Sequence, residues 1–169
     1  MGAFTYPRSE PGSGGHMDLV ERLVAFSATL QQKLAGLPES ALSYRPGNDE
    51  WSLKEVVGHL RDHAEFLHKR LAKMIQLEEP RLQTFDEQAL LRERDPQAAS
   101  FDDLLAEVVR YRTEAVELLA ELVHWNWART GRHEELGRIS IRQLVDRAIA
   151  HDETHLAHIR ELKEKAATA

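Results

Sequence analysis

Two histidines spaced four residues apart give this sequence its strongest chemical signal. His151 and His155 belong to the stretch His-Asp-Glu-Thr-His, and His158 follows three residues later. Residues four apart project from the same face of an α-helix, so the two imidazoles could share one metal ion. The spacing alone is only moderately specific, because nine histidines in 169 residues also produce chance pairs. The pattern therefore raises a metal site as a hypothesis that needs a third ligand.

The third ligand must come from another segment, and His59 and His63 offer two alternatives. On a helical wheel that begins at Leu53 the apolar arc spans roughly 300° to 40°, with His63 at roughly 280° and His59 at roughly 240°. The wheel slightly favours His63. Three neutral imidazoles leave coordination positions for water or substrate, as in a catalytic site, and nitrogen ligands suit zinc, nickel, iron or copper.

Two other metal sites compete with this hypothesis. A di-iron bundle needs Glu-x-x-His on two helices, and the pairs Glu65/His68 and Glu121/His124 have that spacing. Because Glu121 and His124 lie outside the apolar arc of their helix, we interpret both pairs as solvated surface. A zincin-like peptidase needs glutamate directly after the first histidine, where this chain has Asp152. The shorter side chain argues against proteolysis, although Asp152 could still act as a general base.

Asp152 also lies inside the apolar arc of its own helix, where an unpaired carboxylate is rare. Arg112 has a similar central position on another predicted helix and is its candidate partner. We therefore expect a structural ion pair, with a catalytic role for Asp152 as the alternative. Trp125 and Trp127 flank the loop before the last helix and are interpreted as packing and surface residues, or as walls of a pocket above the metal.

Composition excludes several classes of protein. The absence of cysteine rules out disulfides, cysteine zinc fingers and a cysteine nucleophile, and is compatible with a cytoplasmic location. A net charge of -6 without a basic patch argues against nucleic acid or an anionic membrane as the partner. No apolar run approaches the ~20 residues of a membrane span. The remaining expectation is an enzyme or binding protein with a small-molecule ligand.

Four amphipathic helices can position these residues. Ser52 with Glu55 and Ser140 with Gln143 are capping boxes that predict two helix starts. The expected helices cover residues 18–35, 53–77, 101–123 and 141–162, with a short helical turn at 85–92 in the connection. We predict an all-α four-helix bundle over residues 18–169 and a mobile arm over residues 1–17. The connection between the second and third helices is too long for a hairpin and favours a non-sequential topology.

Two motifs resemble the DinB superfamily. Residues 51–60, Trp-Ser-Leu-Lys-Glu-Val-Val-Gly-His-Leu, are similar to the Trp-Ser-x-x-Glu/Gln-x-x-x-His-Leu start of its second helix, and residues 151–159 resemble its fourth-helix signature. Tyr6-Pro7 and Phe85-Asp86-Glu87 are similar to the YfiT-like branch. The resemblance covers most of the chain. It implies a four-helix bundle with an unusual helix order and one divalent metal ion per chain.

Carried over by motif position, the metal ligands that the resemblance implies are His59, His151 and His155. It overrules the wheel preference for His63, which becomes a pocket residue, and it makes His158 a neighbour of the site. The metals we expect first are zinc or nickel, with iron or manganese as alternatives. The remaining four histidines are interpreted as bystanders: His16, His68, His124 and His133.

Relatives implied by the resemblance include metal-dependent hydrolases, S-transferases that use low-molecular-weight thiols such as bacillithiol, and a mycothiol-dependent isomerase, and dimers are common among them. Our first hypothesis is a thiol S-transferase, in which the metal lowers the pKa of a cosubstrate thiol. The second is a hydrolase that uses His63 or Asp152 as a base. The third is a stress-associated metal-binding protein without turnover.

Overall fold

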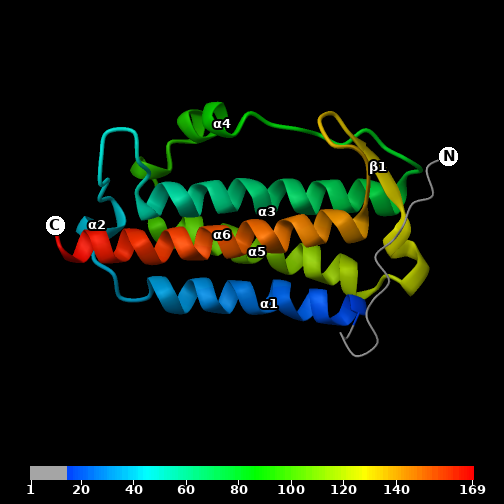
Figure 1. Ribbon diagram of the computed structural model, residues 1–169, viewed down its shortest axis with the longest axis horizontal. Helices are drawn as coiled ribbons and strands as arrows, with labels where there is room; N and C mark the ends of the chain where they lie inside the picture. Colours follow the sequence, from blue (N-terminus) through cyan, green and yellow to red (C-terminus); the bar gives the residue numbers. More distant parts are fainter. Residues whose placement is uncertain (1–14) are drawn as a thin grey trace.

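Four long helices make up most of the protein, as the sequence predicts. The structure is a computed structural model that describes residues 15–169 (Figure 1). Its elements in chain order are α1 Gly15–Leu34, α2 Glu39–Leu42, α3 Leu53–Gln76, α4 Glu87–Arg94, η1 Pro96–Ala98, α5 Phe101–Ala120, η2 His124–Ala128, β1 Thr130–His133, β2 Gly137–Ser140 and α6 Ile141–Ala167. The prediction of an all-α four-helix bundle is confirmed. No helix of the described residues is long and apolar enough to cross a membrane.

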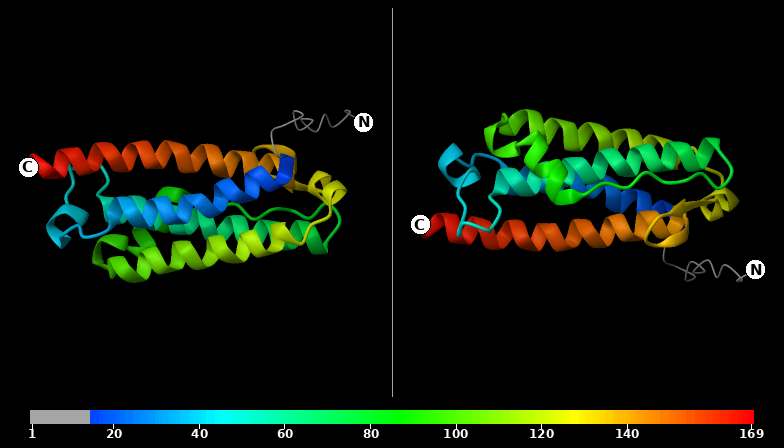
Figure 2. Two further views of the ribbon diagram at one scale, coloured as in Figure 1. Left: turned by 90° about the horizontal axis from the view of Figure 1, so that it is seen from below. Right: turned by 90° about the horizontal axis from the view of Figure 1, so that it is seen from above.

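The helices are not connected in a simple up-and-down order. α1 and α3 each pack against both α5 and α6. α3 and α5 run in the same direction, and α1 and α6 run the opposite way (Figures 1 and 2). The chain must therefore return along the outside of the bundle after α3, and α4 lies on this return path. This is the long connection that the sequence predicts, and its helical turn forms at Glu87–Arg94.

Serine caps fix the starts of the three long helices that follow α1, namely α3, α5 and α6. Ser52 and Ser140 both form complete capping boxes, with Glu55 and Gln143 respectively. Ser100 accepts a hydrogen bond from the backbone N–H of Asp103 at the start of α5. Each cap satisfies a backbone donor that the helix itself cannot pair and contributes about 1 kcal/mol. The two predicted capping boxes are therefore confirmed.

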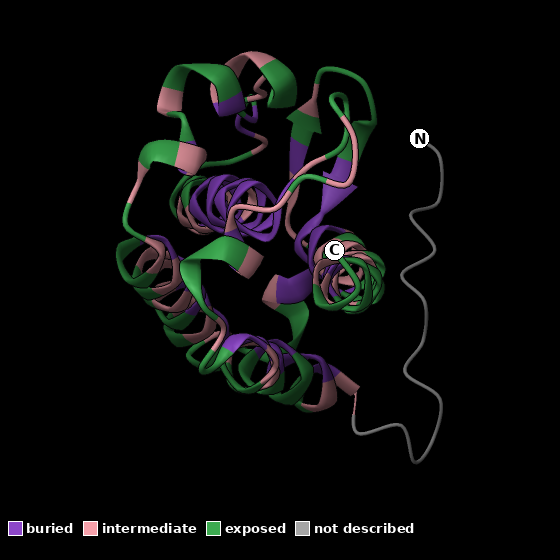
Figure 3. Ribbon diagram, turned by 90° about the vertical axis from the view of Figure 1, so that its left-hand side faces the viewer, coloured by how far each residue is buried: buried purple, intermediate pink, exposed green. Residues whose placement is uncertain are grey.

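The first two turns of α3 are buried on every side. All residues from Leu53 to Leu60 are buried, although the other long helices keep an exposed face (Figure 3). The return connection covers the outer face of α3, where η1 brings Pro96 against Gly58. A Cβ atom on Gly58 would lie 2.6 Å from Pro96 Cβ, so only glycine permits this close approach. His59, in the second of these turns, is buried with them, and the ring of Trp51 lies beside its imidazole with 4.9 Å between centroids.

Two parts of the fold differ from expectation. α1 begins at Gly15, so the last three residues of the arm expected at 1–17 are helical, while residues 1–14 lie outside the described residues. His16 is buried because its ring stacks on Trp127 with 4.3 Å between centroids.

The second difference is a β-hairpin that the sequence did not indicate. β1 and β2 pair antiparallel, with Thr130 opposite Ser140. Leu82 of the return connection packs on this hairpin so closely that a Cβ atom on Gly131 would lie 2.8 Å from Leu82 Cδ2. The hairpin is therefore held against the first residues of the return connection, where Pro80 and Leu82 also form backbone hydrogen bonds with Arg132.

Candidate metal centre

Three imidazoles converge between α3 and α6, which pack against each other and run in opposite directions (Figure 1). His59 comes from α3, and His151 and His155 come from α6. One nitrogen of each ring lies within 4.8 Å of one nitrogen of each of the others. The Nε2 atoms of His59 and His151 are 3.0 Å apart. The structure thus brings together the three residues that the family motif implies as ligands.

The chemistry of these donors fits a divalent metal ion. His59 is buried, with an exposed fraction of only 3%. Nδ1 of His155 is also buried and has no hydrogen-bond partner among the described residues. A buried nitrogen without a partner costs free energy unless a ligand supplies the missing bond. Coordination of a metal would satisfy such atoms, and imidazole is a common ligand of zinc and nickel.

The electrostatics keep the three rings neutral, which is the form that binds metal. Burial, followed by repulsion from His63 and His155, lowers the pKa of His59 to about 3. Burial and the neighbouring histidines lower the pKa of His151 to about 2. Burial, followed by His158, lowers the pKa of His155 to about 4. No proton therefore has to be displaced from these rings near neutral pH when a metal binds.

His63, which the wheel favoured as a ligand, lies beside the three-histidine group. Its ring stacks on that of His151 with 3.9 Å between centroids, and its Nε2 atom is 2.7 Å from Oε1 of Glu87. His59, His63 and Glu87 also meet the distance criterion for a metal site, but Glu87 is exposed. The wheel placed His59 further from the apolar arc because it assumed a single buried face, whereas the start of α3 is buried on every side.

Asp152 forms the expected ion pair with Arg112. The two terminal nitrogens of Arg112 donate to the two carboxylate oxygens of Asp152 over 2.6 and 2.9 Å, and both side chains are buried. Burial raises the pKa of Asp152, and the contact with Arg112 opposes that rise. The guanidinium also lies over the ring of Phe26, 4.8 Å from its centroid. Both oxygens of Asp152 are thus occupied one residue away from His151.

The other predicted sites do not assemble. Glu65 is buried rather than solvated, because Arg94 and Lys69 each form an ion pair with its carboxylate. This corrects the expectation of a surface pair at Glu65 and His68. Glu121 and His124 are exposed, as expected.

The remaining aromatic and histidine candidates also lie apart from the ligands. His158 is half-buried, with its ring centroid 6.1 Å from that of His155. Trp127 belongs to the hydrophobic core and Trp125 is exposed, so the two tryptophans are packing and surface residues. Neither lines the pocket beside the metal centre.

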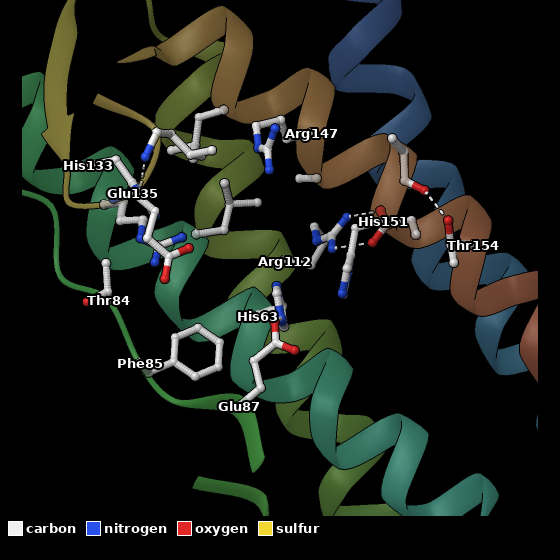
Figure 4. A pocket seen from close by; sticks show the side chains of 17 residues that line it. His63, Thr84, Phe85, Glu87, Arg112, His133, Glu135, Arg147, His151 and Thr154 are labelled. Carbon is white, nitrogen blue, oxygen red and sulfur yellow. Dashed lines mark hydrogen bonds and ion pairs between the residues drawn. The ribbon is translucent and has the colours of Figure 1, made fainter. Parts of the chain in front are cut away.

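A pocket of about 470 Å³ opens beside His63 and His151 (Figure 4). Its volume lies in the range of small-molecule sites. The sequence did not indicate Arg70, Arg147 or Thr84 as pocket residues, and it indicated Glu87 only as part of a family motif. These residues come from α3, α6 and the return connection, and no local spacing links them. His133, interpreted as a bystander, also lines the pocket.

Comparison with known proteins gives the same fold and family. The model of the DinB superfamily matches residues 22–159. A Bacillus subtilis protein named "Uncharacterized protein YuaE" is 24% identical over 145 residues, which cover 79% of this chain and 90% of that protein. An Oceanobacillus iheyensis protein named "Putative metal-dependent hydrolase" is 32% identical over 126 residues, which cover 71% of this chain and 68% of that protein.

Two solved structures share the architecture. YfiT from Bacillus subtilis, described as "a probable metal-dependent hydrolase with an unusual four-helix bundle topology", superimposes with a TM-score of 0.84 and 23% identity, over 96% of this chain and 93% of that chain. TT2238, described as a four-helix bundle protein, has a TM-score of 0.65 and 20% identity, over 86% of this chain and 98% of that chain. These likenesses support the bundle with its non-sequential helix order.

Proposed function

The chain belongs to the DinB superfamily, and from that premise we propose that it is a metal-dependent thiol S-transferase. The observation that carries the proposal is the convergence of His59, His151 and His155 beside a pocket of about 470 Å³. The ligand set contains no carboxylate, so a divalent ion held there keeps its full positive charge. Such a site favours an anionic ligand in its open positions.

His59, His151 and His155 would hold the ion, with zinc or nickel as our proposal for its identity. When bound, the ion supplies Lewis acidity that lowers the pKa of a coordinated thiol. The chain has no cysteine, so the thiol must be a cosubstrate of low molecular weight. This proposal fits a reducing cytoplasm, where free thiols persist.

The residues around the site have separate roles in this proposal. The S–H bond of the thiol breaks, its sulfur bonds to the electrophilic carbon, and the leaving group departs with the electron pair of its own bond. His63 would accept the thiol proton on Nδ1, because its Nε2 atom lies 2.7 Å from the Glu87 carboxylate and burial, which lowers the pKa of His63, keeps the ring neutral. Asp152 is a poorer base, since Arg112 occupies both of its oxygens.

Hydrolysis is the second candidate, and the names of two relatives favour it. The same three histidines and the same His63–Glu87 pair would serve a reaction in which water replaces the thiol. The pocket could then hold the hydrolysable substrate alone. A metal-binding protein without turnover would share the ligands but neither reaction.

A comparison of two substrate panels tests these candidates. The purified protein is analysed for metal, loaded to one ion per chain, and assayed for conjugation of a small thiol to a fluorogenic electrophile. Ester, amide and phosphoester substrates are assayed separately without thiol. We expect conjugation that depends on metal, and hydrolysis without conjugation would assign the second function instead.

Variants of α6 provide the control. We expect His151→Ala to lose both bound metal and conjugation, whereas Arg160→Gln, an exposed change on the same helix, retains both. Full metal content and full activity in His151→Ala would show that the ligand assignment is wrong. Tight metal binding with no reaction in either panel would favour the protein without turnover.

A further inference from the structure

The pocket beside the metal centre has two chemically different ends. His63 and His151 line the end next to the ligands, whereas Arg70 and Arg147 lie further along the same two helices. At 1.5 Å per residue, Arg147 is about 6 Å along α6 from His151, and Arg70 is about 10 Å along α3 from His63. Because the helices are antiparallel, both steps lead toward the hairpin (Figures 1 and 4). Leu67 lines the wall between the two ends.

Arg70 is a partly buried cation without an acidic partner. Its Nε atom donates to the backbone carbonyl of Gln83 over 2.9 Å, and its guanidinium carbon lies 5.7 Å from the ring centroid of Phe66. Within residues 15–169 its terminal nitrogens make no hydrogen bond or ion pair. Burial alone lowers the pKa of Arg70, with no carboxylate opposing the effect. Burying a charge without a partner is costly, so this guanidinium has unused capacity for an anion.

Arg147 and His133 add two further donors at the same end. Arg147 is exposed and has no ion pair in the described part of the chain. Nδ1 of His133 accepts hydrogen bonds from the backbone N–H groups of Glu135 and Leu136, both over 3.1 Å. The neutral ring therefore carries its proton on Nε2. Burial, followed by the charge of Arg70, lowers the pKa of His133; Arg147 adds to the effect, whereas Glu135 and Glu134 oppose it. The net effect is a lowered pKa, so the ring is neutral near pH 7 with both arginines close to it.

The carboxylates near this end do not contact Arg70 or Arg147. Glu87 contacts His63, and Asp152 is fully engaged by Arg112. Glu135 lines the pocket and Glu134 accepts a hydrogen bond from Thr84 over 3.1 Å, and both glutamates are exposed to water. Neither forms an ion pair with Arg70 or Arg147 among the described residues. An anion that reaches the partly buried Arg70 would therefore gain a charge-assisted hydrogen bond that the fold does not supply.

We propose that Arg70, Arg147 and His133 form an anion subsite that holds a carboxylate or phosphate of the small molecule whose reactive group reaches the metal centre. The role of the metal end rests on the proposed function, whereas the anion subsite rests on its own residues. The preferred substrates are then bifunctional molecules, with the anion about one to two helical turns from the reacting atom. Neutral analogues would bind in the same pocket but without the contact between an anion and the arginines, and therefore more weakly.

Direct binding to the metal-free protein tests the subsite independently of any reaction. The full chain, treated with a chelator, is titrated in a calorimeter with 3-phenylpropionate, phenyl phosphate and the neutral 3-phenylpropanamide. We expect each anion to bind about tenfold more tightly than the amide, the value for a charged hydrogen bond of about 1.4 kcal/mol. Equal affinity for the anions and the amide would overturn the proposal.

Four variants assign the effect to residues. Arg70→Gln and Arg147→Gln should each weaken anion binding about five- to tenfold and leave amide binding unchanged. Glu135→Gln should strengthen anion binding, because it removes the only unpaired acid of the pocket within residues 15–169. Arg160→Gln, remote from the pocket, should change neither. Unchanged anion binding in both Arg70→Gln and Arg147→Gln would also overturn the proposal.

A second titration separates this inference from the proposed function. The metal-loaded protein is titrated with 6-mercaptohexanoate and with the neutral 6-mercaptohexan-1-ol, whose chains are long enough to reach from the metal centre to the arginines. If neither thiol binds the metal but the metal-free protein still prefers the phenyl anions, thiol transfer fails and the subsite stands. If 6-mercaptohexanoate binds better and Arg70→Gln removes its advantage, the thiol carries the anion. If the two thiols bind equally while 3-phenylpropionate still binds better than its amide, the anion belongs to the electrophile.

Discussion

Two polar clusters that meet at neighbouring residues of α6, one buried and one partly buried, differ in how the protein balances their charges. Asp152 receives two hydrogen bonds from Arg112, so its charge is neutralised within the fold. His151, the preceding residue, faces other imidazoles that carry no opposite charge. Nδ1 of His155 has no partner in the described structure. Nε of Arg112 also lacks a partner among the described residues, so the difference lies in charge: the ion pair is neutral without a ligand, whereas the histidine group holds no opposite charge and has nitrogen donors free to bind a cation.

The difference separates a stabilising role from a binding role. A buried ion pair contributes little net free energy, but removing one partner leaves the other charge buried and is costly. Burial of neutral imidazoles without partners lowers the free energy of unfolding. Binding of a metal ion to these imidazoles can offset this loss. Substitutions in the Arg112–Asp152 pair should therefore affect folding, and substitutions in the histidine group should affect metal affinity.

The largest expected effect is on folding, from Asp152→Asn. The change leaves the buried Arg112 guanidinium without its opposite charge and should lower the free energy of unfolding by about 3 kcal/mol or more. Urea denaturation with circular dichroism measures this loss. The double variant Arg112→Met/Asp152→Leu is the control, and it should regain most of the stability because no charge stays buried. A loss below about 1 kcal/mol in Asp152→Asn would contradict the structural role.

The next effect is on metal affinity, from His59→Gln. Loss of one ligand of three should weaken binding of a divalent metal at least about 100-fold, while the metal-free protein changes stability by less than about 1.5 kcal/mol. Competition with a chromophoric chelator measures the affinity. The matched variant His63→Gln should retain the metal, since His63 stacks on a ligand without belonging to the three-histidine group. Equal losses in the two variants would mean that His63 is also a ligand.

Acid should lower the free energy of unfolding of the metal-free protein, and the same histidines should cause this loss. In the unfolded chain these imidazoles titrate near pH 6.5, whereas burial lowers the pKa of His59 to about 3 and that of His155 to about 4 in the folded state. Below pH 6.5 the unfolded state therefore binds more protons, and stability falls as the pH decreases toward 4. Each imidazole adds a slope of up to about 1.4 kcal/mol per pH unit.

Urea midpoints between pH 7.5 and 4.5 measure this slope, and His59→Gln should flatten it. That variant has no imidazole at position 59. Acid therefore no longer stabilises its unfolded state by protonating this residue. A slope that is the same in both proteins would show that other groups govern the acid sensitivity.

The smallest effect is expected from His158→Gln, at the edge of the histidine group. His158 is half-buried and 6.1 Å from His155 between ring centroids, and it does not belong to either candidate ligand group. Metal content should stay at one ion per chain, and stability should change by less than about 0.5 kcal/mol. Metal analysis and urea denaturation check both values. Loss of the ion would extend the site to a fourth histidine.

Short sequence patterns predicted the features that depend on residues close together in the chain, namely helix starts and helical spacing. The capping boxes at Ser52 and Ser140 are short-range hydrogen-bond patterns, so they predicted the starts of α3 and α6 directly. The pair His151/His155 follows from helical spacing alone. The burial of His59 did not follow in this way, because the wheel assumes one buried face and the start of α3 is buried on every side; the choice of His59 over His63 as a ligand stays a prediction.

Features made by distant segments were not predictable in this way. The hairpin depends on Leu82 packing against Gly131, and its strands show no alternating apolar pattern. The pocket combines Arg70 from α3, Arg147 from α6 and His133 from the hairpin. Such a set becomes visible only when the packing of the bundle and the path of the return connection are known.

The helix order also determines when the metal centre can form during folding. His151 and His155 are one helical turn apart and meet as soon as α6 forms, but His59 lies 92 residues before His151. Closing so long a loop costs conformational entropy and slows folding, so the third ligand arrives last. Tight metal binding is therefore a property of the completed topology. An ion held by all three histidines resists unfolding of the whole bundle rather than of one helix.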